Sequence, residues 1–260
     1  MPKFSIITVN YNDVEGLQKT VESVLHQSFI DFEYIIVDGA SNDGSVAYIE
    51  KVKPFITHFI SEKDKGVYEA MNKGLRLAKG DYVLFLNSGD FFIDESLLQR
   101  ASLKIAGTKA LYYGDLIFCS AKEEFLRTYP QKLEFSYFLE RSLPHPGTFI
   151  KRTLFDELFY YSEHFKIISD WEFFIYAICK ANVSYQHIDE TISVFNLKGM
   201  SNDPKNKAII EAEKAVVYQK YFEEEHRLAL VNRKDNKQLD RKNSFFKMEK
   251  ILQFVFSKRG

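Results

Sequence analysis

A single carboxylate, Asp90, stands directly after the most strand-like stretch of the chain. The apolar run at residues 82–86 ends in the polar sequence Asn87-Ser88-Gly89-Asp90. Unbroken apolar runs are typical of parallel strands that helices cover on both faces, and open α/β sheets bind ligands beyond the carboxyl ends of their strands. Asp90 would therefore suit a hard cation such as Mg²⁺, which takes one or two protein carboxylates and completes its shell with waters and substrate phosphates. The alternative is a plain turn, which favours the same residue types.

Polar groups also follow the three predicted strands that precede this one. They are Asn10-Tyr11-Asn12 after residues 4–9, Asp38 after residues 34–37, and Glu62-Lys63-Asp64 after residues 57–60. Because the carboxyl ends of parallel strands meet at one edge of a sheet, these groups would converge with Asp90. Asp38 would accept hydrogen bonds from a base or ribose, Tyr11 would pack on the base, and a cation at Asp90 would bridge a diphosphate. Each residue alone is better explained as a cap or turn former, but four strand ends together favour a nucleotide site.

The elements that would hold these groups alternate between strand and helix. Helical periodicity follows the first strand over residues 14–27, with Asp13 as the predicted N-cap, and recurs over residues 46–52 and 67–79. This alternation predicts βαβ units and an α/β fold with a mostly parallel central sheet and helices on both faces. Beyond Asp90 the pattern predicts a mixed region and then helices: a helix at 94–105, strands at 110–118, 124–129 and 148–150, a helix at 170–181, a strand at 183–195 and a charged helix from 205 to about 225.

Composition narrows the class of protein. The 260 residues are 45% hydrophobic, which provides for a sizeable core, and the net charge of −1 gives no global field for nucleic acid. Cys119 and Cys179 are the only cysteines, lack metal-ligand spacing and are expected to be core thiols. No apolar run approaches the ~20 residues that span a bilayer. Because the N-terminus also lacks signal-peptide organisation, we expect a cytoplasmic protein.

Four ordered motifs in the first half of the chain resemble those of family 2 glycosyltransferases. They are FSIITVNYN at residues 4–12, VDGASNDGS at 37–45, SEKDKGVYEAMNKG at 61–74 and GDYVLFLNSGD at 80–90, and the resemblance extends over residues 3–200. It implies the GT-A fold, a Rossmann-like α/β fold. It also implies an inverting transferase that moves a sugar from a nucleotide-sugar, usually a UDP-sugar, to an acceptor hydroxyl.

The resemblance assigns roles to residues of these motifs. Asp90 would be the last position of an Asp-x-Asp-like motif that holds Mn²⁺ or Mg²⁺. The chain departs from the common pattern at Asn87, where an acidic residue is often found, and at Gly89, so that Asp90 is the sole carboxylate of the motif. We therefore expect weak cation affinity until a diphosphate supplies further ligands. The residues implied to bind the nucleotide are Thr8, Tyr11, Asp38, Asp64 and Asn87.

The second half of the chain would supply the catalytic base and the acceptor site. Residues 169–172 resemble the family's acidic catalytic motif, which makes Asp170 the predicted general base; its alternative role is a helix N-cap. Trp171, the only tryptophan, would either stack on a sugar ring or pack in the core. His145, in a stiff Leu-Pro-His-Pro-Gly turn, is a candidate acceptor residue, with a structural histidine as the alternative. Lys198 is a candidate lid residue that would meet the diphosphate, with a solvated loop as the alternative.

These assignments predict a catalytic domain followed by an extension. The catalytic domain would cover residues 1–203, with a nucleotide-binding half at 1–90 and an acceptor half at 91–203, and residues 204–260 would form a C-terminal helical extension. The leading function is sugar transfer in surface polysaccharide or glycolipid synthesis, onto a saccharide or lipid-linked saccharide. The alternatives are a non-catalytic nucleotide-sugar-binding or scaffold protein, and a nucleotidyltransferase, although the Gly-rich basic loop of the latter is missing after the first strand.

The C-terminal segment has an amphipathic pattern of its own. Residues 244–256 place most of their apolar side chains on one helical face, and the block 241–260 holds six basic residues against one acidic. This pattern is typical of a helix in an anionic membrane interface, which would place the protein at the inner face of the membrane. The alternative is that the same face packs on the catalytic domain or on a second subunit, which leaves a homodimer open.

Overall fold

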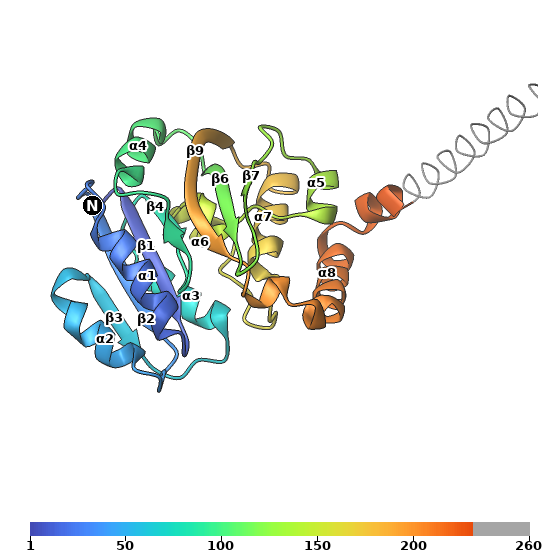
Figure 1. The fold of residues 1–260 in the computed structure, drawn as a ribbon. Coiled ribbons are helices and arrows are strands. Elements are labelled where there is room, and N and C mark those ends of the chain that lie inside the picture. Colours follow the sequence, from blue (N-terminus) through green and yellow to red (C-terminus); the bar gives the residue numbers. More distant parts are fainter. Residues whose placement is uncertain (231–260) are drawn as a thin grey trace, which may run out of the picture. The chain divides into compact units, whose positions relative to one another are not determined.

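The structure is a computed structural model that describes residues 1–230 (Figure 1). The predicted C-terminal helix at residues 244–256 lies outside the described residues. The chain divides into a first compact unit, Met1–Lys214, and a second unit that begins at Ala215. The sheet and every candidate site residue belong to the first unit. The domain boundary that we predict after residue 203 stays a prediction.

The first unit is built on one sheet in which the strand order is β3-β2-β1-β4-β8-β6-β9-β5, with β7 added beside β6. The block β3-β2-β1-β4 is entirely parallel, whereas β8 joins β4 and β6 in antiparallel pairs. The longest pairings, β1 with β2 and β6 with β9, are parallel, which confirms the mostly parallel sheet. The strands are β1 Phe4–Asn10, β2 Phe32–Asp38, β3 His58–Ser61, β4 Tyr82–Phe85, β5 Phe91–Phe92, β6 Leu111–Cys119, β7 Glu124–Arg127, β8 Thr148–Lys151 and β9 Tyr185–Asn196.

Helices cover this sheet and confirm the predicted α/β class. All seven residues of β1 are buried, as expected for a strand with both faces covered. The side chain of Asp13 accepts a hydrogen bond from the Gly16 N–H at 3.1 Å, which confirms the predicted N-cap of the first helix. The α-helices are α1 Val14–Leu25, α2 Ser45–Val52, α3 Val67–Leu77, α4 Leu97–Lys104, α5 Phe135–Glu140, α6 Thr153–Glu157, α7 Ser169–Cys179 and α8 Lys207–Tyr221.

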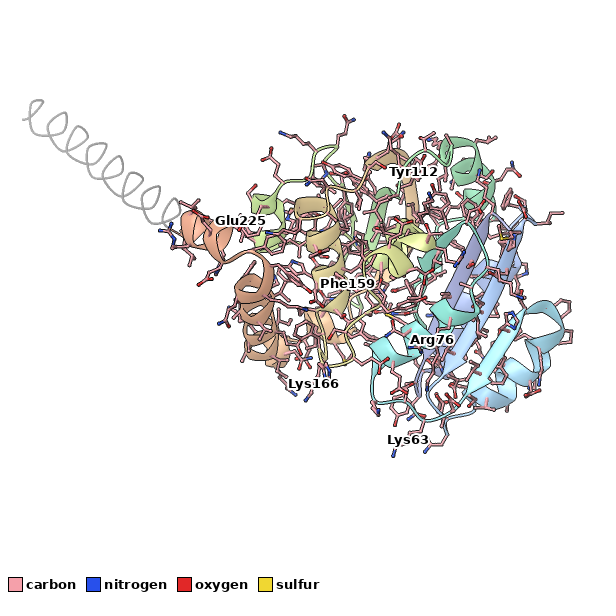
Figure 2. The ribbon with its side chains drawn as sticks, turned by 180° about the vertical axis from the view of Figure 1, so that it is seen from behind. Lys63, Arg76, Tyr112, Phe159, Lys166 and Glu225 are labelled. Carbon is pink, nitrogen blue, oxygen red and sulfur yellow. The ribbon has the colours of Figure 1, made fainter. Side chains whose placement is uncertain are left out.

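Aromatic side chains form much of the core beside α6 and α7. Phe155 stacks on Phe173 with ring centroids 4.6 Å apart, and Phe159, labelled in Figure 2, meets Phe173 edge-on at 5.7 Å. Such pairs stabilise beyond their buried area alone. The high aromatic content of this half therefore serves packing. Cys119 and Cys179, by contrast, are half-buried thiols and not the core thiols that we expect from the sequence.

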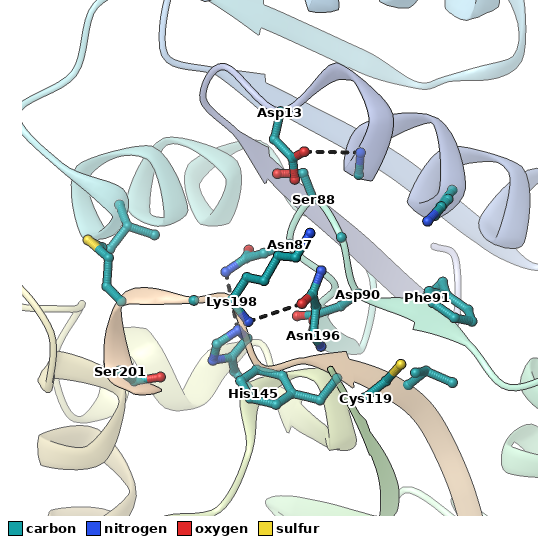
Figure 3. Close-up of a pocket in the computed structure, with 18 of the residues that line it drawn as sticks. Asp13, Asn87, Ser88, Asp90, Phe91, Cys119, His145, Asn196, Lys198 and Ser201 are labelled. Carbon is teal, nitrogen blue, oxygen red and sulfur yellow. Dashed lines mark hydrogen bonds between the residues drawn. The ribbon is translucent and has the colours of Figure 1, made fainter. Parts of the chain in front are cut away.

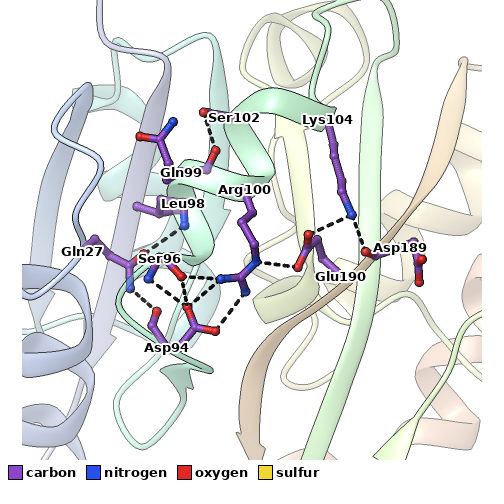
Figure 4. Close-up of polar contacts among 10 residues, drawn as sticks. All are labelled: Gln27, Asp94, Ser96, Leu98, Gln99, Arg100, Ser102, Lys104, Asp189 and Glu190. Carbon is purple, nitrogen blue, oxygen red and sulfur yellow. Dashed lines mark hydrogen bonds and ion pairs between the residues drawn. The ribbon is translucent and has the colours of Figure 1, made fainter.

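The segment that follows Asp90 is tied to elements on both sides (Figure 4). The buried Gln27 side chain donates to the Asp94 carbonyl oxygen at 2.7 Å and accepts from the Leu98 N–H at 2.9 Å. Arg100 pairs with Asp94 at 2.9 Å and with Glu190 of β9 at 3.0 Å. Part-exposed ion pairs contribute little, so the amide of Gln27 is the stronger restraint on this segment.

A buried carboxylate fixes the entry into β4. Glu33 Oε1 accepts hydrogen bonds from the Ser5 hydroxyl at 2.6 Å, from the Gly80 N–H at 2.9 Å and from the Lys79 N–H. A Cβ atom at Gly80 would lie 2.7 Å from the backbone of Phe4, so the turn can approach β1 only as glycine. Glu33 thereby fixes the start of β4 beside β1, and β4 leads into the turn at residues 87–90.

We expect Glu33→Ala to destabilise the first unit, because it removes the acceptor of the buried Ser5 hydroxyl and of the Lys79 N–H, whereas the Gly80 N–H keeps Ser5 Oγ as a partner. Each buried donor left without a partner costs about 1–3 kcal/mol. Urea unfolding followed by circular dichroism measures the loss. The matched control is Glu50→Ala, which removes a half-exposed carboxylate paired only with Lys53 and should stay within about 0.5 kcal/mol of wild type. Equal stability of the two variants would contradict this role for Glu33.

Candidate active site

A cavity of about 600 Å³ opens in the first unit beyond the carboxyl ends of β1 and β4 (Figure 3). Its walls come from both halves of the predicted catalytic domain. The first half contributes the start of α1, one face of α3 and the turn after β4, and the second half contributes the turn before β8, the start of α7 and the loop after β9. Its polar lining includes Asp13, Asn87, Asp90, His145, Asp170 and Lys198.

The turn that carries Asp90 is held by a residue that the motifs do not reveal. The buried hydroxyl of Thr20, on α1, lies 2.6 Å from the Asp90 carbonyl oxygen and accepts the Gly89 N–H at 3.0 Å. On the other side, the Ser88 N–H donates to the Val9 carbonyl oxygen at 3.1 Å. The available signal was a lone polar residue on the otherwise apolar face of a predicted helix, since buried polar groups need partners.

The carboxylate of Asp90 is almost fully buried, at 4% exposure. One of its oxygens accepts the Asn196 N–H, from the end of β9, at 2.8 Å. Burial raises the pKa of Asp90 to about 7, although His145 and the Asn196 hydrogen bond both act to lower it. Asn196 is a further site residue that sequence reasoning missed, because only the β5–β9 pairing brings it here.

No cluster of three or more His, Cys, Asp or Glu side chains in residues 1–230 is placed to hold a metal ion. A cation at Asp90 would therefore take one protein carboxylate and draw its other ligands from substrate and water. That donor set fits Mg²⁺ or Mn²⁺ with a bound diphosphate better than a dedicated protein cage. The geometry is thus compatible with the one-carboxylate site that we predict from the sequence.

Asp170 lines the same cavity from the start of α7. It is the second residue of α7, whose N-cap residue is Ile168 with no side-chain cap, so the alternative of Asp170 as the N-cap is wrong. Its Oδ1 accepts the Tyr68 hydroxyl at 2.9 Å, and its Oδ2 lies 3.2 Å from His145 Nδ1. Burial and the nearby carboxylate raise the pKa of Tyr68 well above its usual value, which keeps the phenol protonated as a donor. A carboxylate in the first helical turn is also favoured by the helix dipole.

Two contacts fix the loop that leads into α7. Asn72, on α3, makes a paired hydrogen bond with the backbone of Tyr161, at 2.8 and 3.1 Å. Glu213, on α8, accepts the backbone N–H groups of Lys166 and Ile167 at 2.7 and 3.2 Å; Figure 2 labels Lys166 on this loop. Both residues were missed from the sequence, because each partner lies 46 or more positions away along the chain.

Of the residues predicted to bind the nucleotide, Asn87 lines the cavity, whereas Thr8, Tyr11, Asp38 and Asp64 do not. Tyr11 is 68% exposed, and a Cβ atom placed on Gly39 would lie 3.0 Å from its ring and 2.9 Å from Asp64 Oδ2. Tyr11 and Asp64 therefore flank Gly39. Burial raises the pKa of Asp64. Thr8 is fully buried and bonds to the Leu86 carbonyl oxygen at 2.7 Å.

Asp38 lies beside this group, fully buried. Its two oxygens accept four hydrogen bonds from the protein, at 2.6–2.9 Å, from the side chains of Asn10, Ser41 and Ser61 and from the Ser41 N–H. A carboxylate offers about four acceptor positions, so all of them are occupied. Asp38 can accept a bond from a nucleoside only if one of these donors gives way.

Trp171 and Lys198 differ in their placement. Trp171 is 3% exposed, does not line the cavity, and donates its indole N–H to the Phe138 carbonyl oxygen at 2.9 Å. Its ring therefore adopts the core-packing alternative and not the stacking position for a sugar. Lys198 is exposed on the cavity wall, and its backbone N–H bonds to the Asn196 side chain at 3.0 Å.

The sequence profile described as Glycosyl transferase family 2 matches residues 5–170 of the chain. The protein belongs to glycosyl transferase family 2. This confirms the family and the transferase class that the four motifs predict. The match spans both walls of the cavity, from the first strand to Asp170.

Curated relatives agree with this membership. The chain is 32% identical over 180 residues to an uncharacterized glycosyltransferase of Mycobacterium tuberculosis, which covers 68% of this chain and 69% of the relative. It is 28% identical over 219 residues to a PGL/p-HBAD biosynthesis glycosyltransferase of Mycobacterium bovis, covering 81% of this chain and 83% of the relative.

Solved structures show the same fold. S. aureus TarS 1-349 in complex with UDP-GlcNAc aligns with a TM-score of 0.63 at 21% identity, covering 76% of this chain and 59% of that one. The mannosyltransferase PcManGT of Pyrobaculum calidifontis, in complex with GDP-Man and Mn²⁺, aligns with a TM-score of 0.57 at 17% identity, covering 77% and 59%. The chain thus spans about three fifths of the length of these crystallised chains. At these identities the likeness establishes the fold, and it confirms the GT-A architecture.

The raised pKa of Asp90 predicts a pH-dependent stability. Its folded value of about 7 exceeds the ordinary 3.8, so the folded state retains a proton that the unfolded chain releases. This stabilisation is complete below pH ~4 and is lost as the pH rises through about 7. Asp90→Asn is neutral at every pH and lacks this loss. We expect urea unfolding in EDTA to show that the free energy of unfolding of the variant rises relative to that of wild type from about pH 5 to pH 7. Above about pH 7 this difference should stay constant. A difference that stays constant from about pH 5 to pH 7 as well would contradict the burial argument.

Proposed function

We propose that the protein transfers a sugar from a UDP-sugar to an acceptor hydroxyl with inversion at the anomeric carbon. The observation that carries this proposal is the cavity at the strand ends, which both the Asp90 and the Asp170 side chains line. One carboxylate is thereby available to a cation and the other to an acceptor hydroxyl. Family membership supplies the reaction class.

The donor diphosphate would lie against the turn at residues 87–90. Asp90 would hold Mn²⁺ or Mg²⁺, which supplies charge to the leaving diphosphate when bound. The likeness to PcManGT, whose structure contains Mn²⁺, supports divalent metal use. Tyr11 and Asp64 would hold the nucleoside, with Thr8, Asp38 and Asn87 around it. For Asp38 this requires that Ser41 or Ser61 yields its hydrogen bond.

Asp170 is the proposed general base. As the acceptor oxygen bonds to the anomeric carbon, the bond to the diphosphate breaks, UDP leaves as the anion, and the acceptor proton moves to the Asp170 carboxylate. The Tyr68 hydroxyl bond leaves this carboxylate with lone pairs for that proton. His145 and Lys198 line the same cavity and remain the proposed acceptor and lid residues.

The acceptor and the site of action extend the proposal. We propose a saccharide or lipid-linked saccharide acceptor in surface polysaccharide or glycolipid synthesis, a role supported by the relative named for PGL/p-HBAD biosynthesis. Within residues 1–230, no helix is both long enough and apolar enough to cross a membrane. Attachment to an anionic membrane through residues 244–256, a homodimer, and the division into a domain at 1–203 and an extension at 204–260 also remain proposals.

Donor turnover tests the proposed function directly. The full-length protein, given a panel of UDP-sugars and Mn²⁺, should release UDP from at least one of them, faster with saccharide acceptors. EDTA should abolish the release, excess Mn²⁺ or Mg²⁺ should restore it, and Asp90→Ala should lack it while remaining folded. Binding of UDP-sugars without any turnover would favour the scaffold alternative. Formation of a UDP-sugar from UTP and a sugar phosphate would favour the nucleotidyltransferase.

Asp170→Asn tests the role of Asp170 as the general base independently of donor binding and stability. The amide keeps the shape of the side chain but cannot take the acceptor proton, so transfer should fall by ~10²-fold or more, while UDP affinity and thermal stability stay at the wild-type level. Asp156→Asn, a change to a half-exposed carboxylate on α6, is the matched control and should transfer normally. Near-normal transfer by Asp170→Asn would remove Asp170 from the catalytic role.

A further inference from the structure

His145 lies between the two walls of the cavity, and both of its ring nitrogens have partners. Nδ1 lies 3.2 Å from Asp170 Oδ2. Nε2 lies 3.2 Å from Asn87 Nδ2 (Figure 3). The side chain is 17% exposed. A continuous chain of hydrogen bonds therefore runs from the Tyr68 hydroxyl through Asp170 and His145 to Asn87.

Sheet pairing explains why residues so far apart in sequence meet here. β8 pairs with β4 in antiparallel register, with Tyr82 opposite Lys151 and Val83 opposite Ile150. The start of β8 consequently lies beside the end of β4. The turn that contains His145 directly precedes β8, and Asn87 follows β4 by two residues.

The backbone around His145 is anchored on both sides. The Thr148 hydroxyl donates to the Pro144 carbonyl oxygen at 2.7 Å, and the Ser193 hydroxyl donates to the Pro146 carbonyl oxygen at 2.7 Å. Both hydroxyl residues are fully buried. Each proline also fixes its own φ. The ring of His145 is thus presented from a turn with little freedom to move.

The chemistry of the two partners determines the ring tautomer. A carboxylate only accepts hydrogen bonds, so Nδ1 must carry the proton toward Asp170. The amide N–H of Asn87 only donates, so Nε2 is the acceptor in this orientation. A reversed Asn87 amide would require a second proton at Nε2, but it would leave the Nδ1–H bond to Asp170 unchanged. In the orientation described, Asn87 Oδ1 is buried and has no hydrogen-bond partner among residues 1–230.

We propose that His145 is a positioning residue for the Asp170 base, an inference that rests on the proposed transferase function. Tyr68 fixes one carboxylate oxygen and the His145 Nδ1–H fixes the other, so the carboxylate cannot rotate without breaking a bond. Through Nε2 the same ring ties the base to the turn that carries Asp90. The base and the diphosphate subsite are thereby held at one spacing, and misplacement by about 1 Å costs ~10²-fold in rate.

Ring spectroscopy tests the geometry without any need for turnover. In two-bond ¹H–¹⁵N correlation spectra of the full-length protein, the signal lost in His145→Asn identifies the ring. That ring should be protonated at Nδ1, and Asp170→Ala, which removes the acceptor, should abolish this preference. A ring protonated at Nε2 alone, or one that Asp170→Ala leaves unchanged, would overturn the proposal. If wild type cleaved no UDP-sugar, the transferase function would fail, whereas the tautomer would still decide this pairing.

Kinetics test the positioning role with two substitutions, each of which places an amide at the position of one of the two ring nitrogens. The asparagine amide of His145→Asn reaches the Nδ1 position and can still donate to Asp170, whereas that of His145→Gln reaches the Nε2 position beside Asn87. The probe is UDP-GlcNAc, or whichever UDP-sugar the wild type cleaves. His145→Gln and His145→Ala should lose ~10²-fold in kcat with an unchanged donor KM, and His145→Asn should recover most of kcat. Equal kcat in all three variants, or a loss confined to KM, would overturn the proposal.

Discussion

The structure depends on one buried carboxylate that its own chain leaves incompletely satisfied. Asp90 is 4% exposed, and within residues 1–230 its carboxylate receives a single hydrogen bond, from the Asn196 N–H. Burying a charge with so few partners is costly, and either protonation or cation binding removes that cost. The raised pKa of Asp90 corresponds to protonation, and a metal-bound diphosphate would supply the cation. The hydrogen bonds of Thr20 to the Asp90 carbonyl oxygen and the Gly89 N–H, and of the Ser88 N–H to Val9, hold the backbone that carries this side chain.

The two halves of the first unit supply different parts of the cavity, and the sheet joins them. The parallel block β3-β2-β1-β4 brings its strand ends, and the turn at residues 87–90, to one edge. The antiparallel β8 then sets the His145 turn beside that edge, and α7 brings Asp170 to the same ring. Asn72 and Glu213 hold the loop before α7 from two further helices. This pairing places the proposed cation site and the proposed base site in one cavity.

The sequence predicts what depends on local pattern. The strand ends, the Asp13 cap and the mostly parallel sheet follow from apolar periodicity and residue type, and the ordered motifs identify the family. What could not be predicted depends on distant partners. The four donors on Asp38 come from three residues, of which Asn10 and Ser61 lie 28 and 23 positions away. Trp171 donates its N–H to the carbonyl oxygen of Phe138, 33 positions away, and packs inward. Thr20 and Tyr68 join the site only through contacts more than 65 residues away. The N-cap alternative for Asp170 is wrong because α7 begins at Ser169, so that Asp170 lies inside the helix.

We propose that the cavity at the strand ends binds the donor diphosphate with a cation at Asp90. Crystals of the full-length protein grown with UDP and Mn²⁺ test this binding through the anomalous scattering of manganese. We expect an anomalous peak within coordination distance, about 2.0–2.1 Å, of an Asp90 carboxylate oxygen, with the diphosphate between this ion and the Asp170 side of the cavity. Bound UDP with the manganese elsewhere, or with Asp90 still in contact with protein alone, would contradict it.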